Sequence, residues 1–199
     1  MYKKNESSCL HVRGDFLIHI SVRIVTKIVA IEGFFMEQKN FQFQMPRFRE
    51  IPNVGLYLEQ TVQYINDCIA PLDLAITSSM LSNYVKKGYV DRPVKKQYNA
   101  EQIAYLIFMS IVKQTLSMEN IAALFQMQKG TYSIQEAYNY FCEELEKKLK
   151  KLFAGDFTDE NPADMTFEKR ALTSVVIAIS NIIYLNFCFK EIKEDGLSE

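Results

Sequence analysis

The sequence predicts a mostly α-helical protein in which a helix-turn-helix with a short basic wing precedes two long helices. From about residue 54 onward, apolar residues recur at spacings of three and four, the period of one helix face. Ser, Thr or Asn stands directly before several of these apolar runs, where such residues cap the first turn of a helix. Residues 171–189 carry no charge and suit a helix that is apolar on most sides.

Length and charge limit the possible architecture and partners. The chain has 199 residues, 48% of them apolar, enough for a core in one or two small domains. The net charge is −1, but residues 76–98 hold five bases against one acid, a net +4. Residues 131–199 hold eight bases against thirteen acids, a net −5. This polarity favours one surface for a polyanion, or a solvated basic face without a partner.

Residues 1–35 differ from the rest of the chain. Charged residues interrupt the run FLIHISVRIVTKIVAIEGFF, so we expect neither a signal peptide nor a membrane span there. We expect the natural start at Met36, because codons for Glu32–Gly33 can spell a purine-rich ribosome-binding sequence. Residues 1–35 would then be a translated leader, which contains both histidines of the chain, His11 and His19.

The first two predicted helices form the helix-turn-helix. The first covers residues 58–69 and ends at Pro71. Thr77 is expected to cap the second, over residues 77–87, and Gly88 to end it in a left-handed conformation. The inward residues are Leu58, Val62, Ile65 and Ile69 on the first helix, and Leu81, Tyr84 and Val85 on the second. The segment that follows is extended or turned, because Pro93 disfavours a helical conformation for the residue before it.

Two further helices follow the basic segment. Asn99 and Gln102 form a capping box for a helix that reaches about Gln114. Ser117 caps the next, over residues 118–125, and residues 128–133 are expected to be a linker. The inward side chains are Ile103, Leu106, Ile107 and Ile111, followed by Ile121, Leu124 and Phe125.

The second half of the chain predicts two longer helices. The first carries an apolar seam at spacings of 4, 3, 4, 4 and 3, which suits either a homodimer or an intrachain bundle. The seam residues are Ile134, Tyr138, Phe141, Leu145, Leu149 and Leu152. The second covers residues 171–189, buried between other helices or in a dimer. We do not expect it to span a membrane, because Asn181 and Asn186 interrupt it and charges adjoin both ends.

The sequence lacks the residues that most enzymes need. No histidine follows Met36, and the glycines never cluster into a phosphate-binding loop. The four cysteines, Cys9, Cys68, Cys142 and Cys188, lie too far apart in sequence for a zinc motif. We therefore expect that the protein is not an enzyme and binds neither a metal nor a cofactor. We also expect it to be cytoplasmic and to form no disulfides.

The basic segment supplies candidate DNA contacts. A helix-turn-helix places its second helix in the major groove, while flanking bases hold phosphates. The outward face of residues 77–87 offers Ser78, Ser79, Ser82, Asn83, Lys86 and Lys87. The wing, residues 91–98, offers Arg92, Lys95, Lys96 and Tyr98.

These residues resemble a known family. MLSNYVKKGYV at 80–90 resembles the recognition helix of MerR-type regulators, with Leu81, Tyr84 and Gly88 in register. Residues 98–125 resemble the segment after that family's wing. Residues 46–195 also resemble a poorly characterised bacterial family, catalogued as a domain of unknown function. The resemblance implies a winged helix-turn-helix that binds double-stranded DNA. The sequence departs from the family at Ser82, where the family has Arg, and in its short wing.

Two functions follow as expectations. The first is a DNA-binding transcriptional regulator, in which a homodimer contacts a two-fold site through residues 46–128 and uses residues 131–195 for dimerisation or effector binding. The aromatic residues Tyr132, Tyr138, Tyr140 and Phe141 suit either a small-molecule effector pocket or a core. The second is a non-catalytic helical adaptor that uses the same module to bind a protein. The short wing and Ser82 favour this alternative.

Overall fold

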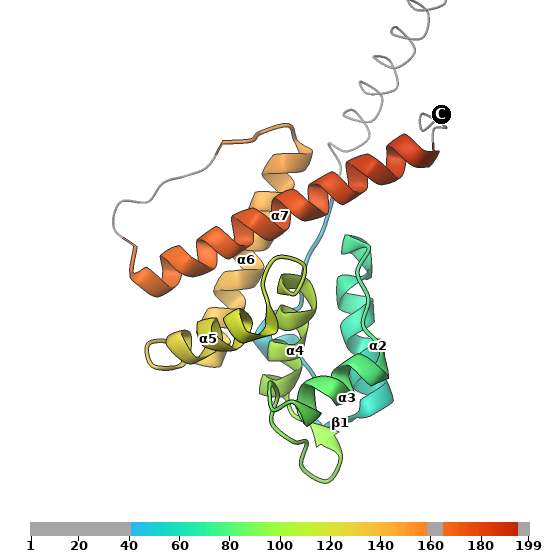
Figure 1. Ribbon diagram of the computed structural model, residues 1–199, viewed down its shortest axis with the longest axis vertical. Coiled ribbons are helices and arrows are strands. Elements are labelled where there is room, and N and C mark those ends of the chain that lie inside the picture. Colours follow the sequence, from blue (N-terminus) through green and yellow to red (C-terminus); the bar gives the residue numbers. More distant parts are fainter. Residues whose placement is uncertain (1–40, 159–164, 195–199) are drawn as a thin grey trace, which may run out of the picture. The chain divides into compact units, whose positions relative to one another are not determined.

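The described part of the chain is built almost entirely from helices (Figure 1). The computed structural model describes residues 41–158 and 165–194, so the expected leader and the start at Met36 lie outside it. The elements in chain order are η1 (Phe48–Glu50), β1 (Leu56–Tyr57), α2 (Leu58–Ile69), η2 (Ala70–Leu72), α3 (Ser78–Lys86), β2 (Gln97–Tyr98), α4 (Ala100–Val112), α5 (Met118–Lys129), α6 (Ile134–Phe153) and α7 (Phe167–Glu194). The prediction of a mostly α-helical fold is confirmed.

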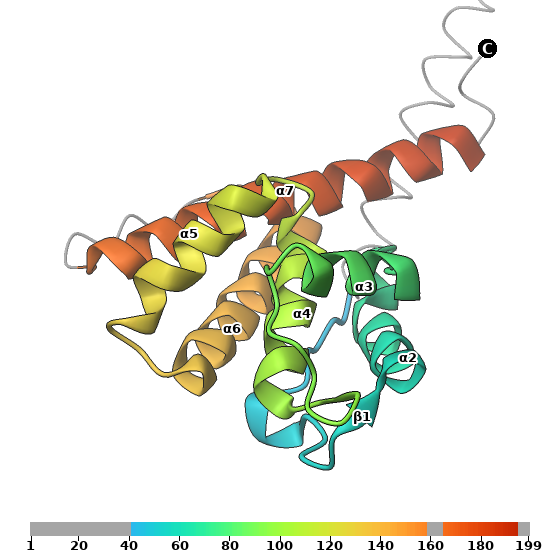
Figure 2. The same cartoon turned by 60° about the horizontal axis from the view of Figure 1, so that its bottom comes forward.

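Helix α4 is the centre of the hydrophobic core. It contacts α2, α6 and α7, and Figure 2 shows it between α2 and α6. Residues buried on almost all sides of this helix include Ile103, Leu106, Ile107 and Ile111, as the sequence predicts. Because α4 packs on elements from both halves, residues 46–128 and 131–195 share one core.

The start of each helix follows its capping residue. Asn99 accepts a hydrogen bond from the backbone N–H of Gln102, whose side chain accepts one from the Asn99 N–H, which confirms the capping box. Ser117 accepts from the N–H of Asn120 at the start of α5. Helix α5 then continues to Lys129, four residues beyond the predicted end, and shortens the linker before α6.

The seam of α6 is buried within the chain. Five of its six residues are at most 5% exposed: Tyr138, Phe141, Leu145, Leu149 and Leu152. Helix α6 packs along α7 and against α4. The ring of Phe141 contacts that of Phe108 edge-on, with the ring centroids 4.9 Å apart. Only Ile134 is half-buried. These side chains cannot form a dimer interface while the chain keeps this fold, so their expected role in dimerisation is corrected to that of an intrachain core.

Helix α7 extends beyond the uncharged stretch at both ends and includes the charged residues that flank it. Its buried face contains Val176, Ile179, Ser180, Ile183 and Tyr184, which face α6 and the core. In the described part of the chain, Phe167–Glu191 is long and apolar enough to cross a membrane by length and composition. Its apolar window has a mean hydropathy of 1.8, and 28% of that window is buried.

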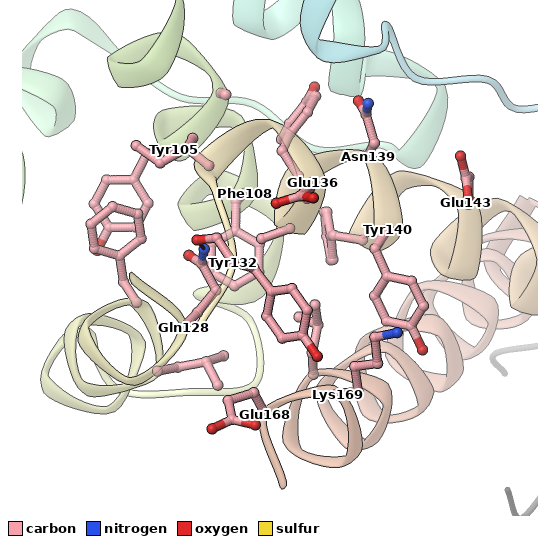
Figure 3. A pocket seen from close by; sticks show the side chains of 18 residues that line it. Tyr105, Phe108, Gln128, Tyr132, Glu136, Asn139, Tyr140, Glu143, Glu168 and Lys169 are labelled. Carbon is pink, nitrogen blue, oxygen red and sulfur yellow. Dashed lines mark hydrogen bonds between the residues drawn. The ribbon is translucent and has the colours of Figure 1, made fainter. Parts of the chain in front are cut away.

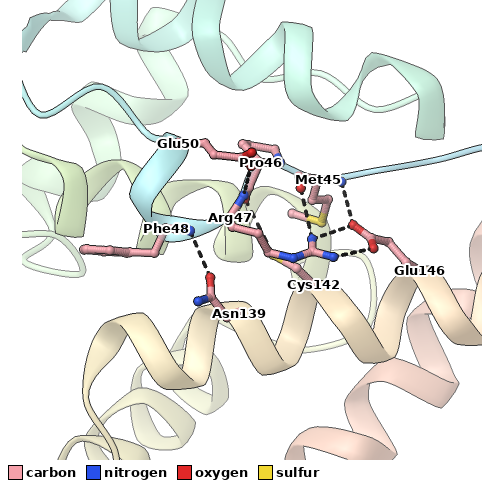
Figure 4. Close-up of polar contacts among 8 residues, drawn as sticks. All are labelled: Met45, Pro46, Arg47, Phe48, Glu50, Asn139, Cys142 and Glu146. Carbon is pink, nitrogen blue, oxygen red and sulfur yellow. Dashed lines mark hydrogen bonds and ion pairs between the residues drawn. The ribbon is translucent and has the colours of Figure 1, made fainter.

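The segment before α2 is fastened to α6 by polar contacts (Figure 4). The guanidinium of Arg47 forms two hydrogen bonds of 2.7 Å to the carboxylate of Glu146. The same carboxylate accepts the N–H of Met45 at 2.7 Å, and Asn139 accepts the N–H of Phe48 at 2.9 Å. The hydrogen bonds to Glu146 raise the pKa of Arg47. The segment before α2 is thus tied to α6.

Candidate nucleic-acid interface

Helices α2 and α3 pack on each other through short apolar faces (Figure 1). Helix α2 buries Val62, Ile65 and Ile69, and α3 buries Leu81 and Tyr84. Burial also raises the pKa of Tyr84, as expected for a phenol taken out of water. These five are among the seven inward positions that the sequence predicts, and the other two, Leu58 and Val85, are half-buried. The opposite face of α3 is therefore left to solvent.

An asparagine fixes the connection between the two helices. The side-chain amide of Asn66 on α2 donates to the carbonyl of Ile76 at 3.0 Å, and its oxygen accepts the Ile76 N–H at 2.8 Å. One residue later, the hydroxyl of Thr77 accepts the N–H of Met80 at 3.2 Å, which confirms the predicted cap. The start of α3 is thus set relative to α2.

The end of α3 adopts the predicted left-handed stop. Gly88 has a φ of 77°, where a side chain would be strained. The N–H of Gly88 donates to the carbonyl of Val85 at 3.1 Å, and that of Tyr89 to Tyr84 at 3.0 Å. This pair of bonds is a Schellman motif. It turns the chain sharply into the basic segment.

The basic segment is anchored at two points after this stop. The hydroxyl of Tyr89 donates to Glu119 on α5 at 2.8 Å, and Gln102 on α4 donates to the carbonyl of Asp91 at 2.9 Å. Hydrogen bonds from its own backbone N–H and from Tyr89 lower the pKa of Glu119, and the charge of Lys87 adds to this effect. Glu119 thus fastens the basic segment to α5 through Tyr89.

Residues 94–97 form a hairpin turn with two central residues, and the strand that follows pairs with the strand before α2. Strand β2 runs antiparallel to β1, with Leu56 opposite Tyr98 and Tyr57 opposite Gln97. The N–H of Gln97 donates to the carbonyl of Val94 at 2.9 Å and closes the turn.

Lysines occupy both central positions of this turn. The φ angles of Lys95 and Lys96 are 51° and 66°. Positive φ at both positions is the requirement of a type I′ turn, which favours Asn-Gly. Two lysines are therefore held in a conformation that L-residues with a side chain rarely adopt. Their side chains are exposed at the tip of the hairpin.

Most of the predicted site residues are exposed on these two elements. The exposed residues are Ser79, Ser82, Asn83, Lys86 and Lys87 on or directly after α3, and Arg92, Lys95 and Lys96 in the wing. Ser78 is half-buried, and its hydroxyl donates to Glu59 on α2 at 2.8 Å. Ser78 therefore fixes α3 to α2 and offers less to a partner than its neighbours do.

Tyr98 does not belong to the exposed set. It is 4% exposed and lies in the hydrophobic core, where burial raises its pKa. Side chains alternate along a strand, so Tyr98 faces inward at the register that pairs it with Leu56. Its expected role as a phosphate contact is therefore corrected.

Sequence reasoning missed the strand that supports the wing. Gly55, just before β1, lies so close to β2 that an added Cβ would be 2.7 Å from the Cβ of Gln97. Two-residue strands separated by two helices carry no local pattern long enough to reveal their pairing. The isolated Gly55 before Leu56 is a sequence signal for such a close approach.

In residues 41–158 and 165–194, no group of three or more His, Cys, Asp or Glu side chains is placed to hold a metal ion. No curated protein and no solved structure matches the chain. Residues 46–141, from the segment that contacts α6 into the second turn of α6 itself, match the profile of a domain of unknown function, DUF1836. This range is shorter than the 46–195 expected from the sequence. A DUF1836 domain thus covers the candidate interface, η1 to α5 and the start of α6.

Proposed function

We propose that the chain is a cytoplasmic DNA-binding transcriptional regulator whose helix α3 and 94–97 turn contact double-stranded DNA. The observation that carries this proposal is the turn itself. Lys95 and Lys96 are exposed, positively charged and kept at positive φ, on a hairpin attached to the strand that leads into α2. Backbone strain that persists in a folded protein is concentrated at functional sites.

The order of elements supports the same proposal. A short strand, two helices, a paired hairpin strand and a further helix follow one another over residues 56–112. This order suits a MerR-like winged helix-turn-helix, in which α3 would enter the major groove and the wing would hold phosphates. Lys86 lies at the end of α3, nearest the basic segment.

Base contacts are assigned to the exposed middle of α3. Asn83 suits a bidentate pair with adenine, and the hydroxyl of Ser82 suits several base edges. Both are exposed, whereas the hydroxyl of Ser78 is already bonded to Glu59. The charge of this segment supports affinity for DNA, and these two residues carry the expected sequence preference.

A homodimer on a two-fold site remains part of the proposal, because two copies of α3 would double the contacts with DNA. Its interface is not the α6 seam, whose residues from Tyr138 to Leu152 are buried inside one chain. Dimerisation therefore requires another surface.

Selection of bound duplexes from a random library at two salt concentrations tests the proposal. We expect one enriched sequence and weaker binding at the higher salt concentration, because bound lysines release counterions from phosphates. Lys95→Ala and Lys96→Ala should each weaken binding about equally for all sequences, and Asn83→Ala should relax the preference at one base. Lys129→Ala, at the exposed end of α5, is the matched control and should change neither.

A helical adaptor is the second candidate, and exposed apolar side chains on the 94–97 turn and on β1 favour it. Val94 is 72% exposed and Tyr57 is 53% exposed. If no duplex is enriched, and Val94→Ser abolishes the capture of one specific protein, the adaptor replaces the regulator. Enrichment that Val94→Ser leaves intact supports the regulator.

A further inference from the structure

Helices α4, α5, α6 and α7 surround a cavity that the DNA-binding proposal does not use (Figure 3). Its volume is about 420 Å³, within the range of about 300–1,000 Å³ that is usual for small-molecule sites. The sequence leaves open whether the aromatic residues from Tyr132 to Phe141 form an effector pocket or a core. In the structure these residues line the cavity.

Seven of the eighteen residues that line the cavity are aromatic. The ring centroids of Tyr105 and Phe125 lie 4.1 Å apart, and the two ring planes are tilted by 30°. Phe108 also lines this side of the cavity. In the view of Figure 3, Tyr105 and Lys169 lie on opposite sides, with Phe108 and Tyr132 between them. Such walls suit a flat, apolar ligand of one or two rings, because offset aromatic contacts add to the gain from burial.

One end of the cavity holds a lysine. The Lys169 ammonium, in the first turn of α7, lies 5.7 Å from the centre of the Tyr132 ring and 5.5 Å from that of Tyr140. The hydroxyls of Tyr132 and Tyr140 are hydrogen-bonded to Thr166 and Thr173, which holds the rings in place. Ring faces attract the ammonium but offer no acceptor atom, so its N–H groups suit an acceptor on a ligand.

Three carboxylates also line the cavity. Glu136 accepts the N–H and the hydroxyl of Ser133 at 2.9 and 2.7 Å, and Glu168 accepts the hydroxyl of Thr131 at 3.5 Å. Glu143 is exposed. Two of the three therefore already serve as acceptors for hydroxyl groups of the chain. Among the described lining residues, Lys169 is the single cation, and its contacts there are with aromatic faces.

We propose that this cavity binds a small amphipathic carboxylate. The flat apolar body lies against Tyr105, Phe108 and Phe125, and the carboxylate accepts hydrogen bonds from the Lys169 ammonium. This site lies on α4 to α7, apart from α3 and the 94–97 turn, so the inference holds whether or not the protein binds DNA.

Calorimetric titration with three naphthalene compounds tests the proposal. Naphthylacetate, naphthylacetamide and naphthylethylamine share the ring but carry an acid, a neutral amide and an ammonium. We expect the acid to bind about tenfold more tightly than the amide, as a hydrogen bond to a charged group implies, and the amine to bind most weakly. No binding by any of the three, or tightest binding by the amine, would overturn the proposal.

Two variants locate the binding. Lys169→Met should remove the preference for acid over amide and leave the amide affinity unchanged, while the control Lys193→Met, at the exposed far end of α7, should keep the preference. Ala137→Leu, which adds bulk to a lining residue of α6, should weaken all three compounds alike. An unchanged preference in Lys169→Met, or unchanged affinity in folded Ala137→Leu, would contradict the assignment.

Discussion

Lys95 and Lys96 show a conflict between local conformation and charge. A left-handed backbone costs an L-residue with a side chain about 1–2 kcal/mol, whereas Asn-Gly forms the same type of turn with little strain. Compared with Asn-Gly, the two lysines add positive charge at the tip of an anchored hairpin. The conflict is explained if that charge has a partner.

The double variant Lys95→Asn, Lys96→Gly should therefore stabilise the fold. We expect the free energy of unfolding to rise by about 1–2 kcal/mol, because glycine removes the strain at position 96 and asparagine lowers it in part at position 95. Urea denaturation followed by circular dichroism measures this change. An unchanged or lower stability would mean that the two lysines make stabilising contacts of their own in the fold.

The Arg47–Glu146 pair makes a separate contribution to stability. The side chains are 29% and 17% exposed, so both charges are partly removed from water. Glu146→Gln should lower the free energy of unfolding by about 1.5–3 kcal/mol, the usual cost of losing hydrogen bonds to a charged group. The matched control is Glu143→Gln on the exposed face of the same helix, with an expected change within about 0.5 kcal/mol. Equal effects of the two substitutions in thermal unfolding would refute this assignment.

At the scale of elements, the close approach of β1 and β2 holds the wing in place. Gly55→Ala would bring a Cβ within 2.7 Å of the Gln97 Cβ, so the strands must separate. We expect a loss of about 1–3 kcal/mol, as for other overpacked sites. Gly130→Ala has no heavy atom within 4 Å of the new Cβ and should be close to neutral. Chemical denaturation of both variants, compared side by side, checks the difference.

Helices with a strong cap and one apolar face were predictable. The bounds of α2 match the predicted 58–69, and Thr77, Asn99 and Ser117 cap the helices that follow them. Caps and apolar faces depend on residues that are close in sequence, so a short stretch of sequence is enough to predict them. The C-terminal end of α5 lacks a strong stop before Gly130, and its last turn was missed.

The candidate site was predictable in position but not in orientation. The basic residues of α3 and the wing are exposed as expected, because charged side chains rarely bury. The inward position of Tyr98 depends on pairing with Leu56, a contact across two helices. The contact of Arg47 with Glu146 spans 99 residues and likewise leaves no local pattern.

At the scale of the whole molecule, the α6 seam is the feature that sequence alone left open between a dimer and a bundle. Heptad spacing is the same in both cases, and only the position of α4 and α7 decides which partner covers the seam. The structure places Leu145, 0% exposed, inside one chain.

Leu145→Ala should therefore weaken each chain by itself. We expect a loss of about 2–5 kcal/mol, as for other buried leucines. The loss should be the same at two protein concentrations tenfold apart, because no partner chain covers this residue.

Light scattering on the unmodified protein should independently give twice the mass of one chain. Monomer mass at micromolar concentration would contradict the homodimer but not the buried seam.

The most direct test of the proposed function is the salt dependence of DNA binding by the Lys95→Asn, Lys96→Gly variant. Each lysine that leaves a phosphate lowers the slope of log affinity against log salt by about 0.9, so the slope should shrink by about 1.8. The predicted result is a protein that is more stable than the original and binds its selected duplex more weakly. Unchanged affinity and slope in that stabilised variant would contradict the account, because the strained lysines would then have no role in binding DNA.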